Sequence, residues 1–237
     1  MALPMNNTPV YSLTIPSTGK EFKFRPFLVK EEKTLLIAQQ SEDVSIMVDS
    51  LKGVIQSCAK TEIDVNSLAT FDLEYMFMQI RAKSVGEQVE LFLKCDTCTD
   101  EKATSKVVID LPSIKVDIPE GHNNDINVFD DVHVVLKYPS LDILKKMEQT
   151  NLSDADEIFN IVVGSIDKIY NTSEVFHAKD QTKGELLEFL ENLTSEQFTK
   201  VQAFFETMPR LRKEIDYTCP VCNKKHDKVL EGMSSFF

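Results

Sequence analysis

Two short stretches, KCDTCTD at residues 94–100 and TCPVCNK at residues 218–224, decide how this sequence is expected to fold. Each contains a Cys-x-x-Cys pair, and 120 residues separate the two pairs. Apolar and polar residues alternate on both sides of each pair, in QVELFLK and TSKVVID around the first and in KEIDYT and KVLE around the second. Such alternation is typical of β-strands. We therefore predict two β-hairpins, each with a cysteine pair at its tip.

Two hairpins with Cys-x-x-Cys tips are the sequence signature of a zinc ribbon. Two residues between a pair of thiolates allow one backbone turn to bring both sulfurs to about 2.3 Å from one metal ion. Four protein ligands leave no open position for water, which is typical of a structural rather than a catalytic metal. The sequence therefore predicts one structural Zn²⁺ site, with the ligands Cys95, Cys98, Cys219 and Cys222.

Other roles for the cysteines are consistent with the same residues. A thioredoxin-like dithiol uses Cys-x-x-Cys at the start of a helix, whereas strands flank both pairs here. Two separate disulfides are disfavoured by a reducing compartment. His226, four residues after Cys222, can replace one cysteine as a ligand. Ribbons commonly separate their pairs by about 15–20 residues, but loop-closure entropy grows only with the logarithm of length, so a long insert is permitted.

The rest of the sequence predicts an α+β fold in three parts. Residues 1–86 contain an N-terminal β-hairpin, with STGK at its turn and FKFRPF as an aromatic return strand, followed by a helical body. Residues 87–138 and 210–237 form a zinc-ribbon-like β unit made from the two distant Cys-x-x-Cys hairpins and two further strands. Residues 139–209 form a helical insert, and the metal would hold the whole 120-residue stretch between the two cysteine pairs at both ends. The predicted helices fall at 29–40, 44–59, 70–86, 139–150, 154–170, 184–193 and 194–208, the last with a capping box from Thr194 to Gln197.

The composition predicts a folded, acidic protein. The chain has 237 residues, 42% of them hydrophobic, which is enough for one large domain or two small ones. The formal net charge of -12 repels phosphate, so it argues against nucleic acid as a partner and favours docking on other proteins. No stretch approaches the ~18 apolar residues of a membrane span. The N-terminal residues lack the pattern of a signal peptide, so we expect a reducing, cytosol-like compartment.

No pattern in the sequence predicts an enzyme. There is no G-x-S-x-G, no H-E-x-x-H and no glycine-rich phosphate loop. The histidines His122, His133 and His177 are scattered, and Cys58 lies on the apolar face of a predicted helix, where a small buried side chain is expected. We therefore predict no catalytic and no cofactor-binding residues besides the metal ligands. The phenylalanines of FKFRPF are expected in the core, and the C-terminal MSSFF is either a docking peptide or packs against the ribbon.

The segment IPSTGKEFKFRPFLVKEEKTLLIA at residues 15–38, followed by VIQSCA at residues 54–59 and the two cysteine pairs, resembles a family of tailed-phage proteins. This family, of the T-even type, is described as baseplate hub or hub-assembly proteins, and the resemblance covers most of the chain. It implies a non-enzymatic protein that helps to build the central hub of the baseplate, as a component or as an assembly chaperone. It also implies other hub proteins as partners, and a location in the host cytoplasm during assembly or in the tail baseplate of the virion.

Two other classes of function remain as alternatives. The first is a zinc-ribbon regulatory or adaptor protein, although the acidic charge and the absence of a basic stripe weigh against direct contact with nucleic acid. The second is a dithiol oxidoreductase, which would require a thiol with a pKa well below that of free cysteine.

Overall fold

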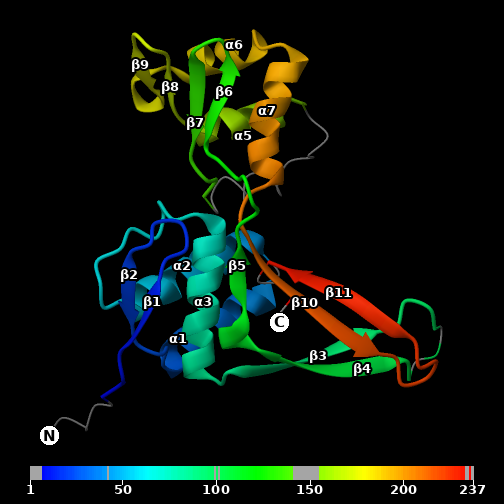
Figure 1. Cartoon of the computed structure of the whole chain (residues 1–237). Helices are drawn as coiled ribbons and strands as arrows, with labels where there is room; N and C mark the ends of the chain where they lie inside the picture. Colours follow the sequence, from blue (N-terminus) through cyan, green and yellow to red (C-terminus); the bar gives the residue numbers. More distant parts are fainter. Residues whose placement is uncertain are drawn as a thin grey trace, which may run out of the picture. The chain divides into compact units, whose positions relative to one another are not determined.

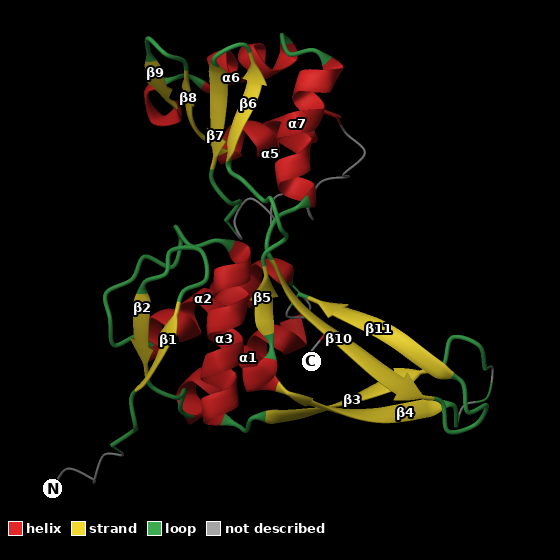
Figure 2. Ribbon diagram, in the orientation of Figure 1, coloured by secondary structure: helices red, strands yellow, loops and turns green. Residues whose placement is uncertain are grey.

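The computed structural model describes residues 7–41, 43–98, 100, 102–140, 155–232 and 235. The chain divides into two compact units (Figure 1). Unit 1 consists of Met1–Asp117 and Arg210–Phe237, and unit 2 consists of Ile118–Pro209. Both contain helices and strands (Figure 2), which confirms the predicted α+β class. Among the described residues, none of the helices has the length and apolar character needed to cross a membrane.

Unit 1 begins with the predicted hairpin of β1 (Tyr11–Thr14) and β2 (Glu21–Phe24), which pair antiparallel. Phe22 and Phe24 are 1% and 2% exposed, so the aromatic strand is part of the core, as predicted. Three helices follow, α1 (Val29–Ser41), α2 (Val44–Cys58) and α3 (Thr70–Ser84). The Asp43 carboxylate accepts hydrogen bonds from backbone N–H groups of the first turn of α2 and so fixes its start.

The two predicted cysteine hairpins are present in unit 1. The first is β3 (Gln88–Lys94) with β4 (Thr104–Asp110), and the second is β10 (Arg210–Thr218) with β11 (Lys225–Glu231). They belong to different sheets, because among the described residues β3 and β4 pair only with each other, whereas β10 lies between β11 and β5 (Lys115–Asp117). Apolar side chains of both hairpins and of α3 share one core, whose buried members are Met78, Ala82, Leu93, Ile109, Leu111, Ile114, Leu211, Ile215, Tyr217 and Leu230.

A short ladder joins the points where the chain leaves and re-enters unit 1. Strand β5 ends at Asp117, the last residue before unit 2, and β10 begins at Arg210, the first residue after it. These two residues are partners in the antiparallel register of β5 and β10. The backbone therefore closes the insert directly at its base, which is a role that the sequence-based interpretation gave to the metal alone.

Unit 2 is a four-stranded antiparallel sheet with helices packed on it. The strand order is β6 (Asp125–Phe129), β7 (Val132–Leu136), β8 (Ile166–Tyr170) and β9 (Val175–His177). The helices are α5 (Ala155–Ser165), α6 (Lys183–Glu191) and α7 (Ser195–Glu206). The predicted Thr194–Gln197 capping box is present at α7, and Thr182 and Glu185 form a second one at α6. The buried core is Val128, Val134, Leu136, Val162, Val163, Ile166, Ile169, Leu186, Leu190, Val201 and Phe204.

The structure divides the chain differently from the sequence-based division. The strands β6 and β7 lie within residues 87–138, which were assigned to the ribbon, but they pair with β8 in unit 2. The helix predicted at 154–170 ends at Ser165, and residues 166–170 form β8 because they complete the ladder beside β7. Residues 139–209 therefore contain two strands and are not a purely helical insert. Most of the helix predicted at 139–150, and MSSFF apart from Ser235, lie outside the described residues.

Candidate metal centre

The two cysteine pairs lie at the ends of their hairpins, just beyond the last ladder residues. Cys95 directly follows β3, and Cys219 directly follows β10. Both turns close in the same way, because the N–H of Cys95 donates to the carbonyl of Ala103 at 2.8 Å and the N–H of Cys219 donates to that of Lys224 at 2.9 Å. The two turns therefore present their first cysteines in equivalent positions, as expected for two halves of one site.

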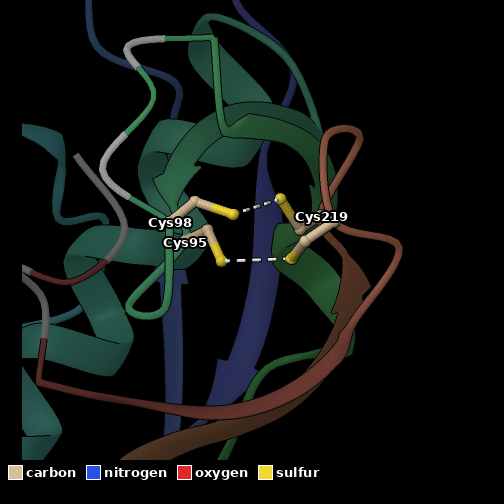
Figure 3. Close-up of side chains that lie close together, drawn as sticks. Cys95, Cys98 and Cys219 are labelled. Carbon is tan, nitrogen blue, oxygen red and sulfur yellow. Dashed lines mark hydrogen bonds between the residues drawn. The ribbon is translucent and has the colours of Figure 1, made fainter.

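The four sulfurs of these cysteines converge on one point between the hairpins. Their Sγ atoms all lie within 4.8 Å of one another. The separation is 3.9 Å between Cys95 and Cys222 and 3.8 Å between Cys98 and Cys219. Figure 3 shows the sulfurs of Cys95 and Cys98 directed across the gap toward the Cys219 hairpin. A tetrahedral ion with metal–sulfur bonds of about 2.3 Å holds its sulfurs about 3.8 Å apart, so the spacing fits such a centre.

The close sulfur contacts run between the hairpins and connect residues more than 120 positions apart in the sequence. Cys95 is 127 positions from Cys222, and Cys98 is 121 positions from Cys219. All four cysteines are free thiols, at separations far above the ~2.05 Å of a disulfide bond. A dithiol redox site would pair the two sulfurs of one Cys-x-x-Cys. The arrangement is instead a single four-sulfur cluster shared by two hairpins.

The pKa values of these thiols move in opposite directions. The pKa of Cys95 is lowered to about 5, mainly by a hydrogen bond from the Thr97 hydroxyl, 3.2 Å away. The pKa of Cys222 is also lowered, mainly by the backbone N–H of Lys224. The pKa of Cys98 is raised to about 12, first by its hydrogen bond with Cys222 and then by burial. Because thiolates at these distances repel one another, all four can ionise together only around a cation.

Groups around the sulfurs orient them without entering the cluster. The imidazole Nε2 of His226 lies 3.2 Å from Cys95 Sγ, and its ring stacks on Tyr217 at a centroid distance of 5.1 Å. The N–H of Val221 donates to Cys219 Sγ at 3.4 Å. His226 is therefore placed as a hydrogen-bonding neighbour of Cys95, a role that the sequence did not reveal. Such neighbours fix the geometry of metal ligands.

Burial is uneven across the four-sulfur cluster. Cys219 is fully buried and Cys95 is 6% exposed, whereas Cys98 is half-buried and Cys222 is exposed. Two hydrogen bonds hold the hairpins together beside the cluster. The Tyr217 hydroxyl donates to the carbonyl of Lys94 at 3.1 Å, and the Ser105 hydroxyl donates to that of Thr218 at 2.9 Å. The approach of the hairpins is thus supported by direct contacts as well as by the cysteines.

The fifth cysteine, Cys58, belongs to a different and buried cluster in the N-terminal part of unit 1. The Arg25 guanidinium donates to the Glu31 carboxylate at 2.8 Å and to the carbonyl of Ser57 at 3.0 Å. It also lies 3.8 Å from Cys58 Sγ. Burial raises the pKa of the Cys58 thiol to about 11, so it stays protonated, as its predicted core role requires. Arg25 thus joins the hairpin to α1 and α2.

The turn of the N-terminal hairpin is attached to α3. The Ser17 N–H donates to one carboxylate oxygen of Asp72 at 3.0 Å, and the Ser17 hydroxyl donates to the other oxygen. Asp72 is fully buried. Arg25, Glu31 and Ser17 all lie in the segment 15–38 that carries the family resemblance, so its polar residues make structural contacts.

The other histidines are placed in unit 2, apart from the cysteine cluster. His122 Nδ1 lies 2.9 Å from the Thr207 hydroxyl, and His133 Nδ1 lies 2.8 Å from the Asp125 carboxylate. His177 is exposed on β9. None of these three is in the group of potential metal ligands that the described residues form.

Comparison with known proteins gives one informative result. Neither the curated proteins nor the solved structures include a match to this chain. The family model described as T4 bacteriophage base plate protein matches residues 8–237, and so covers both units and all four clustered cysteines. The chain therefore belongs to the T4 bacteriophage base plate protein family.

Proposed function

We propose that this chain is a non-enzymatic hub protein of the phage baseplate, either a hub component or a hub-assembly chaperone, whose unit 1 is held together by one structural Zn²⁺. It acts by docking on other baseplate hub proteins, in the host cytoplasm during assembly or in the tail baseplate. Membership of the base plate family supports the setting. The observation that carries the zinc proposal is the convergence of four sulfurs within 4.8 Å.

The ligand set favours zinc acting as a structural ion. Four thiolates in a tetrahedral arrangement are typical of zinc or of an iron–sulfur site. Cys95, Cys98, Cys219 and Cys222 fill all four positions of a tetrahedron, which leaves no site for water or substrate. The ion would neutralise the thiolates and join the two hairpins. Nothing in this arrangement requires a reaction.

An exposed apolar face supports docking on another protein. On α1, the side chains of Val29, Leu36 and Ile37 are 79%, 53% and 56% exposed. Their spacing of seven and eight residues places them on one side of the helix. Exposed apolar side chains that gather on one surface mark interaction sites. This face is therefore the part of unit 1 that we assign to a hub partner.

Metal analysis of the purified full-length chain tests the zinc proposal. We expect one zinc per chain in the wild type and a large loss of zinc in the Cys219→Ser variant, with Cys58→Ser as the matched control that keeps its zinc. If the purified protein is coloured and contains iron, the ion at the cysteine cluster is iron and the zinc proposal is wrong. A chain without metal that reduces insulin disulfides would instead support the dithiol alternative.

Capture from infected cells tests the docking role. We expect the tagged wild-type chain to retain hub proteins and the Leu36→Glu variant to lose them while keeping its zinc. Mass spectrometry of mature particles then distinguishes a hub component, which is present in them, from an assembly chaperone, which is not. Failure of both forms to retain any baseplate protein would contradict the docking role.

A further inference from the structure

Unit 2 contains an open cavity of about 260 Å³, lined by residues of its sheet and of α6. Its lining is mostly apolar and comes from β6, β7, β8, β9 and α6. Tyr170, Asn171, Gln181 and Glu185 provide the polar part of the lining. The volume is just below the range of about 300–1,000 Å³ that is usual for small-molecule sites, so it suits a single large side chain better than a metabolite. The apolar lining residues are Phe129, Val132, Ile169, Phe176, Leu186 and Phe189.

One aromatic residue of this lining is exposed and is not a member of the unit 2 core. Phe176 pairs with Ile169 in the register of β8 and β9, so its side chain is on the same face of the sheet as the core. Ile169 is 8% exposed, whereas Phe176 is 40% exposed. A phenylalanine that borders a cavity and remains open to solvent provides contact area for an incoming side chain.

The strand that contains Phe176 is at the edge of the sheet. In the described part of the chain, β9 pairs with β8 alone. Paired residues of an antiparallel ladder alternate between hydrogen-bonded and non-hydrogen-bonded, and the N–H of Asn171 bonds to the carbonyl of Glu174 at 3.0 Å in the connecting turn. The backbone groups of Val175 and His177 therefore point away from β8. An extended peptide can pair with such an edge.

The negative charge of unit 2 favours a basic peptide. Unit 2 contains 7 Lys and Arg against 17 Asp and Glu, whereas unit 1 contains 19 against 21. Almost all of the net charge of the chain is thus in unit 2. Along the segments that line the cavity, exposed acidic residues outnumber the lysines Lys168, Lys179 and Lys183. These acidic residues either line the cavity or lie close in sequence to its lining, and they are Asp130, Asp131, Glu174, Asp180, Glu185 and Glu188.

We propose that this cavity is a docking site for an extended, basic segment of a partner protein, which inserts one large apolar side chain beside Phe176 and pairs its backbone with β9. The acidic residues around the cavity favour lysine and arginine on either side of the inserted side chain. This site is separate from the α1 face and from the cysteine cluster, and it goes beyond the proposed role in the hub. The proposed occupant is defined by its chemistry, a basic extended segment with one large apolar side chain.

Selection from a random twelve-residue peptide library, displayed on particles unrelated to this chain, tests the proposal. The bait is the full-length chain, and peptides that bind the Phe176→Ala variant are removed by counter-selection. We expect enriched peptides to contain one aromatic or large aliphatic residue flanked by Lys or Arg. A selection that enriches nothing, or that enriches acidic or uncharged peptides, overturns the proposal.

Affinity measurements on one enriched peptide separate the docking site from general charge attraction. We expect Phe176→Ala, or replacement of the apolar residue of the peptide by serine, to weaken binding about tenfold, and 300 mM NaCl to weaken it about fivefold relative to 50 mM. Phe92→Ala is the matched control, since Phe92 is an exposed strand phenylalanine of unit 1 and its loss should leave the affinity unchanged.

The folded state of the variants is checked by thermal unfolding, which we expect to change little for Phe176→Ala because Phe176 is outside the core. If the serine-substituted basic peptide binds as tightly as the parent, the acidic surface attracts cations without a docking site. That result would overturn the proposal. It would leave the zinc site and the hub role unaffected, since both are tested by separate measurements.

Discussion

Unit 1 is assembled from two segments that lie on either side of a 92-residue stretch, whereas unit 2 is that stretch itself, folded as one continuous piece. In unit 1, specific polar groups connect residues far apart in the sequence. Ser17 binds Asp72 across 55 positions, and Cys95 contacts Cys222 across 127. In unit 2, capping boxes at α6 and α7 act within three residues, and the longer polar contacts, such as that of His122 with Thr207 across 85 positions, stay within the one continuous stretch around its apolar core.

This difference follows from the entropy of closing a chain. Contacts between distant segments must offset a loop-closure penalty that local contacts avoid. In unit 1, three kinds of contact offset this loop-closure penalty: the β5–β10 ladder, the buried polar pairs and the cysteine cluster. Because each unit has a core of its own, we expect the two to unfold in separate transitions. The predictions below test whether a change in one unit leaves the other untouched.

Removing the metal should have the largest effect. Structural zinc can contribute on the order of 10 kcal/mol in small domains. Unit 1 also has an apolar core apart from the cysteines, so we expect a smaller loss, confined to unit 1. Calorimetry with and without a chelator should show one transition moved to lower temperature and the other unchanged. Hydrogen exchange read by mass spectrometry identifies the affected unit, since the chain lacks tryptophan as a fluorescent probe. Equal shifts of both transitions would contradict the independence of the units.

Arg25→Ala should have the next largest effect. The Arg25 and Glu31 side chains are 11% and 6% exposed, and removal of one member of a buried pair typically costs about 3–5 kcal/mol because the other charge loses its main partner. Without Arg25, the Glu31 carboxylate keeps only the Leu28 N–H and the exposed Lys30 ammonium, 3.5 Å away. We expect the free energy of unfolding of unit 1 to fall by that amount in urea titrations. The double variant R25M/E31L, which removes both charges, is the control and should recover much of the loss. A double variant as unstable as Arg25→Ala would assign the effect to lost packing.

The same contrast explains which parts of the molecule were predictable. Alternation around the cysteine pairs and the Thr194–Gln197 capping box are local signals, so the hairpins and the start of α7 were predicted correctly. The pairing of Arg25 with Glu31 and of Asp117 with Arg210 depends on tertiary approach, which short-range patterns do not encode. The apolar residues Ile158, Ile161, Val162, Ile166 and Ile169 fit a helical period throughout, yet β7 provides a ladder for residues after Ser165.

A smaller effect is expected at Asn223, which follows Cys222 and has a φ of 58°. This left-handed conformation suits asparagine or glycine and typically costs other residues about 1–2 kcal/mol. We expect Asn223→Val to destabilise unit 1 by about that amount and to weaken its zinc affinity, and Asn223→Gly to be nearly neutral. Asp130 in unit 2 has a φ of 43°, so Asp130→Val is the matched change there and should lower the stability of unit 2 alone. A valine variant of Asn223 with unchanged zinc affinity would mean that the turn does not position Cys222.

The smallest effect is the pH dependence that comes from Asp72. Burial raises the pKa of this carboxyl group above its unfolded value near 3.9, although hydrogen bonds from Ser17 oppose the shift. The ionised carboxylate therefore lowers the free energy of unfolding of unit 1. This loss of stability is complete at a pH above the folded pKa, and it disappears as the pH falls to the unfolded pKa. Glu31 behaves in the opposite way. Burial acts to raise its pKa, but the hydrogen bonds from Arg25 and Leu28 lower it overall, so its contribution is lost only as pH falls through that lowered value.

Comparison of the wild type with Asp72→Asn isolates the Asp72 contribution, because the other titrating groups cancel in the difference. The asparagine still offers one carbonyl oxygen to the Ser17 N–H, and its amide can donate to the Ser17 hydroxyl. We expect the wild-type unit 1 to gain stability relative to the variant as the pH is lowered from 7 toward 4, measured by urea unfolding at each pH. The difference in the free energy of unfolding between the two proteins could instead stay constant over this range or change in the opposite direction. Either result would show that the hydrogen bonds from Ser17 lower the pKa of Asp72 at least as much as burial raises it.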